Sequence, residues 1–367
     1  MNLALAHEYF VAHGGAERVV EVFHEMWPEA PVYTFFHDRR RYGDLPGWNL
    51  RTSYLQWLLL GESHRLLLPL YPNAARALRV PPETDVALVS TSAFIKEIGL
   101  ADRTVAVAYC HSPTRYLYDW SERYLEEEVP QPLVPLVRDL LGRLRDGDQR
   151  AARRFDRWMA NSTAVRGRIE TYYGVTASAI EIVHPPVDVA SFEANEERGD
   201  FWLFVGRLSA YKRADVAVRA FNDVGMRLLV VGEGRERGAL ERMASENVVF
   251  AGRADDATLR SLLASARGLV FPAEDDFGIV CAEALASGAP VVALAAGGIF
   301  DIVRDGEDGV LVDVPEPRAF AEGVLRAERA RFEPKALRDS ARRFDVSRFR
   351  EKVRAIVDDA REKGRAR

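Results

Sequence analysis

The sequence predicts an α/β protein built from two doubly wound parallel sheets. In the second half of the chain, apolar runs of strand length alternate regularly with helical segments. These runs are almost continuously Val, Leu and Phe, which is typical of parallel strands covered by helices on both faces. The first half contains similar strands ending in polar loops, and 367 residues suit about two domains of ~150 residues.

In the first half, a glycine-containing loop precedes a predicted helix at Ala16–Met26, and a long helical region covers Pro132–Arg157. The polar stretch Val189–Asp200 is the best linker candidate. The expected strands of this half are Asn2–Ala6, Pro31–Phe36, Asp85–Ser92, Thr104–Pro113, Trp158–Ser162 and Ala179–His184.

In the second half, strands and helices follow one another without long interruptions. A last helix is expected in Phe349–Arg367, with Val353, Ile356 and Val357 on one face. The expected strands are Phe201–Gly206, Met226–Gly232, Val248–Ala251, Gly268–Pro272 and Val291–Leu294, and the helices between them are Ala214–Asn222, Glu236–Ser245 and Asp256–Ala266.

Composition excludes several classes of protein. The net charge of −5 argues against a protein that coats nucleic acid. The two cysteines, Cys110 and Cys281, lie in different parts of the chain and are expected to be reduced core thiols of a cytoplasmic protein. The start MNLALAHEYF lacks the basic region of a signal peptide, and no apolar run reaches the ~18 residues that span a membrane.

The segment from Phe271 to Leu294 is the most informative stretch of the chain. An apolar strand ends there in an acidic loop, Glu274 to Asp276, and Gly278 then opens a helical pattern that carries Glu283. A strand, a glycine loop and a helix N-terminus together form an anion pocket of free N–H groups. Carboxylates beside it suit hydroxyl donors, so the segment predicts a nucleotide-sugar site.

Basic residues follow the first strand of the second half, in GRLSAYKR. Arg207 and Lys212 at this strand end are suited to hold a diphosphate and to neutralise charge as it leaves, although a solvated loop pair is the alternative. The next glycine-rich stretch, VGEGRERGAL, has one residue too many between its last glycines for a dinucleotide fingerprint. The following strand also ends in Gly252 and Arg253 without the required acid, which disfavours a nicotinamide-dependent oxidoreductase.

Two loops of the first half carry further candidates. Gly14 and Gly15 in HGGAER let the backbone approach a ligand at a helix start, or form a tight turn without one. His7 and His13 have the wrong spacing for a helical zinc site. His111, at the end of a strand, is placed to contact a sugar hydroxyl or to shuttle a proton, or only to cap its loop.

The leucine-rich segment 55–79, with interspersed Trp and Arg, has two interpretations. Amphipathic helices packed on the sheet are one, and contact with a membrane surface or a lipid-linked acceptor is the other. Peripheral attachment to the inner face of the cytoplasmic membrane would follow from the second.

Taken together, the motifs resemble the retaining family 4 glycosyltransferases of the GT-B fold over nearly the whole chain. The strongest similarity is to bacterial mannosyl- or rhamnosyltransferases of O-antigen and exopolysaccharide assembly. The motifs that carry it, in chain order, are HEYFVAHGGAERVV, YCHSP, ANS, VHPPVD, GRLSAYKR, VGEGRE and PAEDDFGIVCAEALASGAPVVAL with GGIFDIVRDGEDGVLV.

The resemblance implies two Rossmann-like domains facing across a cleft. Residues 1–190 would bind the acceptor, 200–345 the nucleotide-sugar donor, and 346–367 would form a helix that crosses back to the first domain.

The resemblance also assigns roles to residues. Arg207 and Lys212 would hold the donor diphosphate, Glu283 the ribose hydroxyls, and His111 would face the transferred sugar. Gly15 would lie on the phosphate side and Arg253 near the base. Backbone amides for the sugar and phosphate would come from Phe277, Gly278 and Ile279.

One residue departs from the family pattern. Counting back from Glu283, the first glutamate of the family pair falls on Asp275, a shorter acid, beside Glu274. Asp275 keeps the family spacing and is the preferred sugar contact, with Glu274 as the alternative. This departure is also the support for a non-catalytic nucleotide-sugar-binding subunit.

We therefore expect a hexosyltransferase that uses a nucleotide diphosphate sugar, with GDP-mannose as the first candidate, and a glycan or lipid-linked acceptor. No residue stands out as a covalent nucleophile, so front-face substitution with retention is expected. His111, Arg207, Lys212 and Asp275 are the candidate catalytic residues. No metal or other cofactor is expected, since no Asp-x-Asp pair follows a strand.

Overall fold

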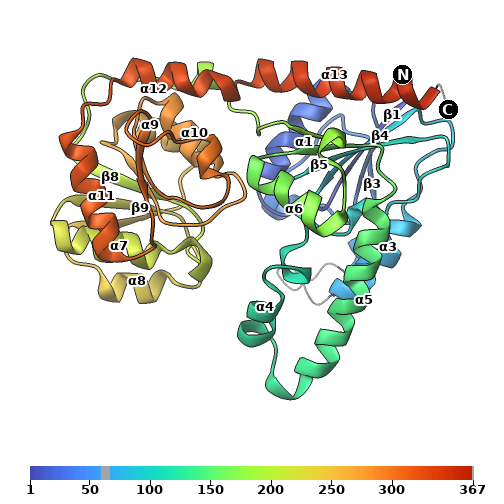
Figure 1. The fold of residues 1–367 in the computed structure, drawn as a ribbon, viewed down its shortest axis with the longest axis horizontal. Helices are drawn as coiled ribbons and strands as arrows, with labels where there is room; N and C mark the ends of the chain where they lie inside the picture. Colours follow the sequence, from blue (N-terminus) through green and yellow to red (C-terminus); the bar gives the residue numbers. More distant parts are fainter. Residues whose placement is uncertain (59–66, 366–367) are drawn as a thin grey trace. The chain divides into compact units, whose positions relative to one another are not determined.

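The computed structural model describes residues 1–58 and 67–365 and divides into two compact units. The first unit comprises Met1–His184 with Phe349–Arg367, and the second comprises Pro185–Arg348. Each unit contains one parallel sheet with helices packed on it (Figure 1). The predicted pair of doubly wound α/β sheets is therefore confirmed.

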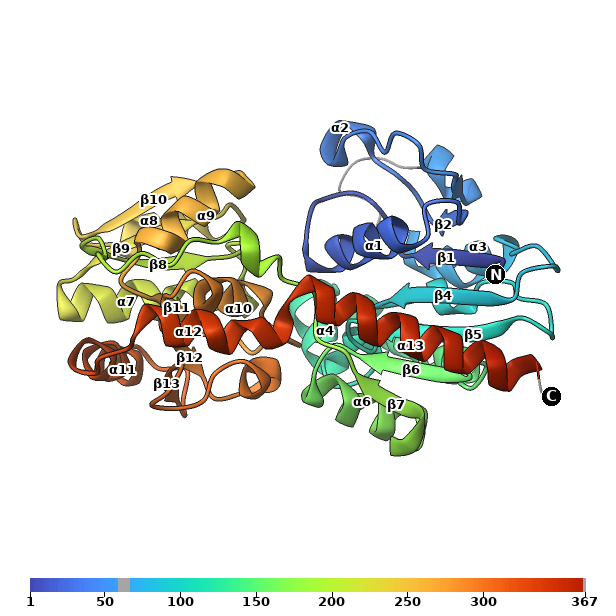
Figure 2. The same cartoon turned by 90° about the horizontal axis from the view of Figure 1, so that it is seen from above.

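The first unit holds a seven-stranded sheet in the order β3-β2-β1-β4-β5-β6-β7, which Figure 2 shows in that sequence from β2 to β7. Every neighbouring pair is parallel. The strands are β1 Leu3–His7, β2 Val32–Thr34, β3 Leu50–Thr52, β4 Val86–Thr91, β5 Val105–Cys110, β6 Arg157–Ala160 and β7 Ile180–Ile182.

The helices of this unit connect these strands. They include α1 Gly15–Met26, α2 Arg39–Tyr42, α3 Tyr71–Ala77, α4 Ser121–Glu128, α5 Val134–Ala152 and α6 Thr163–Tyr173. Central strands β4 and β5 are buried along their whole length, which explains their uninterrupted apolar sequences.

The second unit holds a six-stranded parallel sheet in the order β10-β9-β8-β11-β12-β13. Its strands are β8 Phe201–Val205, β9 Arg227–Val231, β10 Val248–Gly252, β11 Leu269–Phe271, β12 Val291–Leu294 and β13 Gly309–Val312. Its helices are α7 Ala214–Val224, α8 Arg237–Met243, α9 Asp256–Ser265, α10 Ile279–Ala286, α11 Pro317–Arg329 and α12 Pro334–Ala341. Apolar cores lie on both faces of the sheet, and Val189 and Phe192, within the stretch predicted as a linker, are buried in one of them.

The last helix, α13 (Val346–Arg365), packs on the first unit from Phe349 onward. The Phe349 ring stacks on Phe23 with centroids 5.7 Å apart, and Val353 and Val357 are fully buried. Arg361 donates to Asp85 at 3.1 Å. The apolar face predicted for this helix is therefore confirmed at Val353 and Val357.

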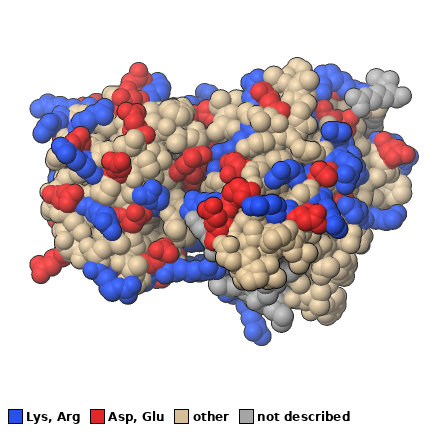
Figure 3. Space-filling view, turned by 60° about the horizontal axis from the view of Figure 1, so that its bottom comes forward, with Lys and Arg blue, Asp and Glu red and all other residues tan. Residues whose placement is uncertain are grey.

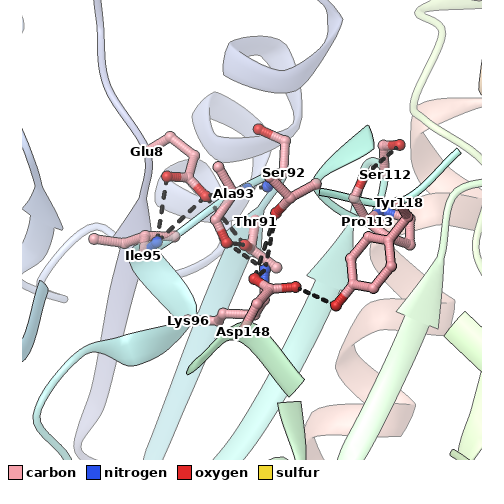
Figure 4. Close-up of polar contacts among 11 residues, drawn as sticks. Glu8, Thr91, Ser92, Ala93, Ile95, Lys96, Ser112, Pro113, Tyr118 and Asp148 are labelled. Atoms are coloured by element: carbon pink, nitrogen blue, oxygen red, sulfur yellow. Dashed lines mark hydrogen bonds and ion pairs between the residues drawn. The ribbon is translucent and has the colours of Figure 1, made fainter. Parts of the chain in front are cut away.

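A buried polar cluster ties the loops after β4 and β5 to helix α5 (Figure 4). Lys96, in the short helical turn Ile95–Glu97, lies 2.6 Å from Asp148 of α5, and their side chains are 1% and 0% exposed. Asp148 also accepts from the Tyr118 hydroxyl at 2.9 Å. The same turn is capped by Glu8, whose carboxylate accepts from the amides of Ala93 (2.6 Å) and Ile95 (3.3 Å).

Close backbone packing accounts for the glycines of VGEGRERGAL. Leu208 donates to the Glu233 carbonyl at 2.9 Å, so the loop after β8 lies directly against the loop after β9. A Cβ atom on Gly234 would stand 2.1 Å from the Leu208 oxygen, and one on Gly232 would stand 1.8 Å from the Gly206 oxygen. Steric exclusion, rather than a dinucleotide, explains this motif.

The substitution Lys96→Met is expected to lower the free energy of unfolding by about 3–5 kcal/mol, because it leaves the Asp148 carboxylate buried without its cation. Urea denaturation measures the loss. The double variant Lys96→Met/Asp148→Leu removes both charges and should be less destabilised than the single variant. An equal or larger loss in the double variant would contradict an uncompensated charge as the cause.

Gly234→Ala should lower the free energy of unfolding by about 1–3 kcal/mol, because its methyl group collides with the Leu208 carbonyl. Gly238→Ala is the matched control four residues later. The nearest atom to its Cβ is the Arg242 side chain at 3.8 Å, and the residue lies in α8. It should raise stability by up to about 1 kcal/mol. Equal effects of the two substitutions would refute the packing explanation.

Candidate functional site

The polar loops of the second unit gather where the strand order of the sheet reverses. Strands β8 and β11 are neighbours, but the chain continues from them toward opposite edges of the sheet. The loop after β8 carries Arg207 and Lys212, and the loop after β11 carries residues 274–276. Such reversal points are the usual ligand positions in open parallel sheets.

Lys212 and Asp275 form a direct ion pair that joins these two loops. Their side chains are 17% and 21% exposed, so the pair is partly withdrawn from water. Burial alone would lower the pKa of Lys212, but Asp275, with Tyr211, outweighs it and raises the pKa above its ordinary value. Lys212 is therefore a fixed cation at neutral pH, and its ammonium lies 5.7 Å from the centroid of the Phe271 ring.

The backbone turns sharply between the Lys212 loop and helix α7. Arg213 has φ of 53°, and it is the one residue other than glycine with positive φ in the ranges 1–58 and 67–365. Its guanidinium donates to Asp215 at 3.1 Å and to the Pro315 carbonyl at 3.2 Å, which hold this conformation. A left-handed residue beside a polar cluster is a common feature of functional sites.

Helix α10 begins beside the ion pair. Gly278 precedes it with φ of 89°, a conformation that a side chain would strain, and as a glycine it has no side chain of its own to cap the helix. Phe277 is buried and Ile279 is half-buried. The helix therefore directs its first amides and the positive end of its dipole at the region next to Asp275.

Gly297 and Gly298 pack against the backbone of the acidic loop Glu274 to Asp276. Gly298 donates its amide to the Asp275 carbonyl at 2.9 Å. A Cβ atom on Gly298 would stand 2.2 Å from the Asp276 oxygen, and one on Gly297 would stand 2.3 Å from the Asp275 oxygen. The sequence analysis included these glycines in the motif GGIFDIVRDGEDGVLV but assigned them no role in the site.

The remaining candidate residues of this unit lie at the same edge of the sheet, where the strands have their carboxyl ends, but they differ in how exposed they are. Glu283 is 4% exposed in α10, whereas Glu274 is exposed on the loop. Arg207 is exposed directly after β8, and Arg253 is exposed after β10, an edge strand two positions from β8. Among the predicted donor-site side chains, Lys212 and Asp275 are in direct contact.

Cys281, one turn into α10, does not supply a nucleophile. The residue is fully buried. Burial, followed by the nearby Asp275 carboxylate, raises the pKa of Cys281 well above its ordinary value. The thiol is therefore neutral, as expected for the core cysteine that the sequence predicted.

In the first unit, His111 follows β5 at the carboxyl edge of the sheet. Its Nε2 lies 2.7 Å from the Ser90 hydroxyl, and that hydroxyl lies 3.0 Å from Nδ1 of His7. Burial, with a smaller contribution from His7, lowers the pKa of His111 to about 3. His111 is therefore a neutral imidazole. Its contact with Ser90 was not predicted from the sequence.

Gly15, the first residue of α1, follows the N-terminal cap Gly14, whose backbone is extended. His13 contacts the Tyr42 carbonyl through Nε2 at 2.7 Å. The structure contains no group of three His, Cys, Asp or Glu residues, within the ranges it describes, placed to hold a metal ion.

Two family models match this chain, one in each half. "Glycosyltransferase Family 4" matches residues 13–191, and "Glycosyl transferases group 1" matches residues 200–329. Both predicted sites lie inside these ranges.

Curated relatives include D-inositol 3-phosphate glycosyltransferases. The enzyme of Nocardioides sp. is 29% identical over 238 residues, which cover 55% of this chain and 50% of that protein. The enzyme of Segniliparus rotundus is 32% identical over 221 residues, which cover 53% of this chain and 47% of that protein. The chain thus spans about half the length of the curated relatives it matches.

Solved structures match over nearly the full chain. HepE of Anabaena, in complex with UDP, has a TM-score of 0.72 at 16% identity, covering 98% of this chain and 100% of that one. Sucrose-phosphate synthase of Thermosynechococcus elongatus has a TM-score of 0.72 at 16% identity, covering 97% and 98%. WaaG, a glycosyltransferase of lipopolysaccharide biosynthesis, has a TM-score of 0.67 at 18% identity, covering 97% and 99%.

These structural matches confirm the GT-B fold, with its two Rossmann-like sheets. The two family models, which cover most of the chain between them, show that this protein belongs to the group 1, family 4 glycosyltransferases.

Proposed function

We propose that this protein transfers a hexose from a nucleotide diphosphate sugar to a hydroxyl of a glycan or lipid-linked acceptor, with retention of anomeric configuration. The observation that carries the proposal is the Lys212–Asp275 pair beside the N-terminus of α10. A cation, the amides of a helix N-terminus and carboxylates at one reversal point match a pyrophosphate flanked by sugar hydroxyls.

In this proposal the second unit binds the donor. Arg207, Lys212 and the amides of Phe277 to Ile279 stabilise the charge that develops on the departing diphosphate. Asp275 or Glu274 accepts from the sugar hydroxyls, Glu283 accepts from the ribose, and Arg253 lies near the base. The Cys281 thiol is neutral and is not assigned as a nucleophile, and we propose front-face substitution without a covalent intermediate as the reaction of this site.

The first unit then binds the acceptor, with His111 facing the transferred sugar and Gly15 on the phosphate side. GDP-mannose is the donor suggested by the similarity to mannosyl- and rhamnosyltransferases of polysaccharide assembly. UDP-glucose is the second candidate, since a structure of HepE contains it. No metal is needed for the proposed chemistry, because side-chain cations and helix amides supply the positive potential.

Contact with a lipid surface through residues 55–79 is part of the proposal for the acceptor. Trp57 is 90% exposed in the turn Tyr54–Leu58, where Tyr54 and Leu58 are each 45% exposed. Residues 59–66 of this segment lie outside the described residues. Among the described helices, none has the length and hydrophobicity to span a bilayer. An exposed Trp among apolar residues suits the membrane interface, on the cytoplasmic side where nucleotide sugars are found.

The charge distribution on the face drawn in Figure 3 does not resemble that of a protein that binds a polyanion. On the face drawn in Figure 3, basic and acidic side chains lie intermixed. A nucleic-acid-binding surface would instead need a continuous basic stripe.

The test of the proposed function is a thermal-shift screen of nucleotide sugars followed by a transfer assay with the donor that binds. GDP-mannose and UDP-glucose are compared with their nucleoside diphosphates; a ligand at ~100 times its dissociation constant adds ~2.7 kcal/mol of stability. Lys212→Ala should then lower the rate of transfer ~30- to 1000-fold at saturating donor, because the leaving diphosphate loses a charge-assisted contact.

Arg219→Ala is the matched control, since Arg219 is an exposed cation on α7, outside the loops of the site. It should leave binding and transfer unchanged. Donor binding without transfer or hydrolysis would favour the non-catalytic nucleotide-sugar-binding subunit. Near-normal turnover by Lys212→Ala would remove the assigned role of this lysine.

Sedimentation with vesicles that contain anionic lipid tests the membrane contact. Trp57→Ser should reduce the bound fraction several-fold, because it removes the most exposed aromatic ring of the segment. Phe300→Ser, in the second unit, is the control, since Phe300 is also an exposed aromatic residue at 59%. Equal binding by wild type and Trp57→Ser would contradict a contact through this turn.

A further inference from the structure

A chain of polar side chains crosses three neighbouring strand ends in the first unit. His7 ends β1, Ser90 is its register partner in β4, and His111 follows β5. The Ser90 hydroxyl lies 3.0 Å from His7 Nδ1 and 2.7 Å from His111 Nε2. It therefore bridges the two imidazole rings where the strand order reverses between β1 and β4.

The bridge has only two arrangements of protons, because the Ser90 hydroxyl has one hydrogen. If Ser90 donates to His111, it accepts from His7 Nδ1–H, and the proton of His111 lies on Nδ1. If Ser90 donates to His7, it accepts from His111 Nε2–H, and Nδ1 of His111 carries a lone pair. The two arrangements give His111 opposite hydrogen-bonding properties on the nitrogen that Ser90 does not contact.

Glu17 distinguishes the two arrangements. Nε2 of His7 is buried and makes no hydrogen bond to any described residue. Glu17 Oε1 lies 3.8 Å from it, with side-chain exposures of 2% for His7 and 13% for Glu17. A carboxylate facing a lone pair at this distance in a buried site is repulsive, whereas a carboxylate facing an N–H is attractive. The Nε2–H form of His7 is therefore favoured, which leaves its Nδ1 to accept from Ser90.

Gly14 leaves room for Glu17 in this position. Glu17 is the third residue of α1, and its carboxylate lies beside Gly14 at the helix N-terminus. A Cβ atom on Gly14 would stand 2.9 Å from Glu17 Oε2, so a larger residue there would require the flexible carboxylate to shift. The positive end of the helix dipole also stabilises an acid in this first turn. Gly14 of HGGAER thus accommodates Glu17 as well as forming part of the turn.

We propose that Glu17, His7 and Ser90 act as positioning residues that fix His111 in the Nε2–H tautomer, so that its Nδ1 accepts a hydrogen bond from a hydroxyl of the bound sugar. The ligand part of this inference rests on the proposed function, whereas the tautomer does not. Two further contacts fix the backbone of His111: its amide donates to Thr91 O at 2.9 Å, and Asn161 Nδ2 donates to its carbonyl at 2.8 Å. The lowered pKa of His111 keeps the ring neutral, with a single lone pair.

Long-range ¹H–¹⁵N correlation spectra of protein labelled at its histidine rings test the tautomer directly. The chain has seven histidines, and His7→Asn and His111→Gln variants assign the two signals. The expected result is a proton on Nε2 and a lone pair on Nδ1 for both His7 and His111. A proton on Nδ1 of His111, or a doubly protonated His7 that reverses the bridge, would overturn the proposal.

Glu17→Gln removes the charge at constant size and should convert His111 to a mixture of tautomers, as should Ser90→Ala. Glu21→Gln is the matched control on the same helix, because Glu21 contacts Tyr42 and His13 instead of His7. Its His111 spectrum should match wild type. An unchanged His111 tautomer in both Glu17→Gln and Ser90→Ala would also overturn the proposed positioning of His111 by Ser90, His7 and Glu17.

The sugar contact is tested with the donor found by the screen. Ser90→Ala should lower kcat/KM about 3- to 10-fold, the loss expected for one misoriented hydrogen bond, while Glu21→Gln leaves it unchanged. Failure of the proposed function and failure of the proposed His111 tautomer give different results. In the first case no donor binds wild type although His111 has the expected tautomer; in the second the donor binds but His111 carries its proton on Nδ1.

Discussion

The reversal of strand order in each parallel sheet is the constraint on which both candidate sites depend. Chain segments leaving adjacent strands β8 and β11 move toward opposite edges, and the same holds for β1 and β4. The loops separate there, so strand ends and helix N-termini stay accessible above the sheet. Lys212 meets Asp275 across one reversal, and His7 meets Ser90 across the other. Each polar contact therefore joins parts of the chain that only this topology brings together.

Backbone packing at glycines keeps the loops of the candidate donor site in place. The loop after β8 rests on Gly232 and Gly234, and the acidic loop rests on Gly297 and Gly298. Each glycine lies where a methyl group would overlap a carbonyl oxygen, so the loops approach one another more closely than other residues allow. The polar side chains that they carry project from rigid supports, which reduces the entropy lost when a ligand is bound.

The sequence was sufficient for most strands of the two sheets and for the position of the candidate donor-site loops, but not for the strands β3 and β13 or for the contacts between the loops. Central strands such as β4 are continuous apolar runs, whereas β3 has three residues, Leu50–Thr52, with an exposed pattern, and it was missed. Lys212 and Asp275 were predicted because each follows a strand; their pairing depends on a separation of 63 residues that no local pattern encodes. Ser90 was missed because a serine at a strand end is common, and its role appears only with both histidines in place.

Asp275, which is shorter than the glutamate of the family pattern, is held in contact with Lys212. A partly buried ion pair is maintained only while each charge keeps a partner, since either one alone would face a desolvation cost. A diphosphate that enters beside the α10 N-terminus brings more negative charge than one carboxylate and competes for Lys212. Asp275 would then be released from its cation while sugar hydroxyls, which are donors, arrive next to it. Under the proposed function, the Asp275 carboxylate thus pairs with Lys212 in the empty site and with the sugar hydroxyls in the occupied site. Neither state leaves a buried charge unpaired.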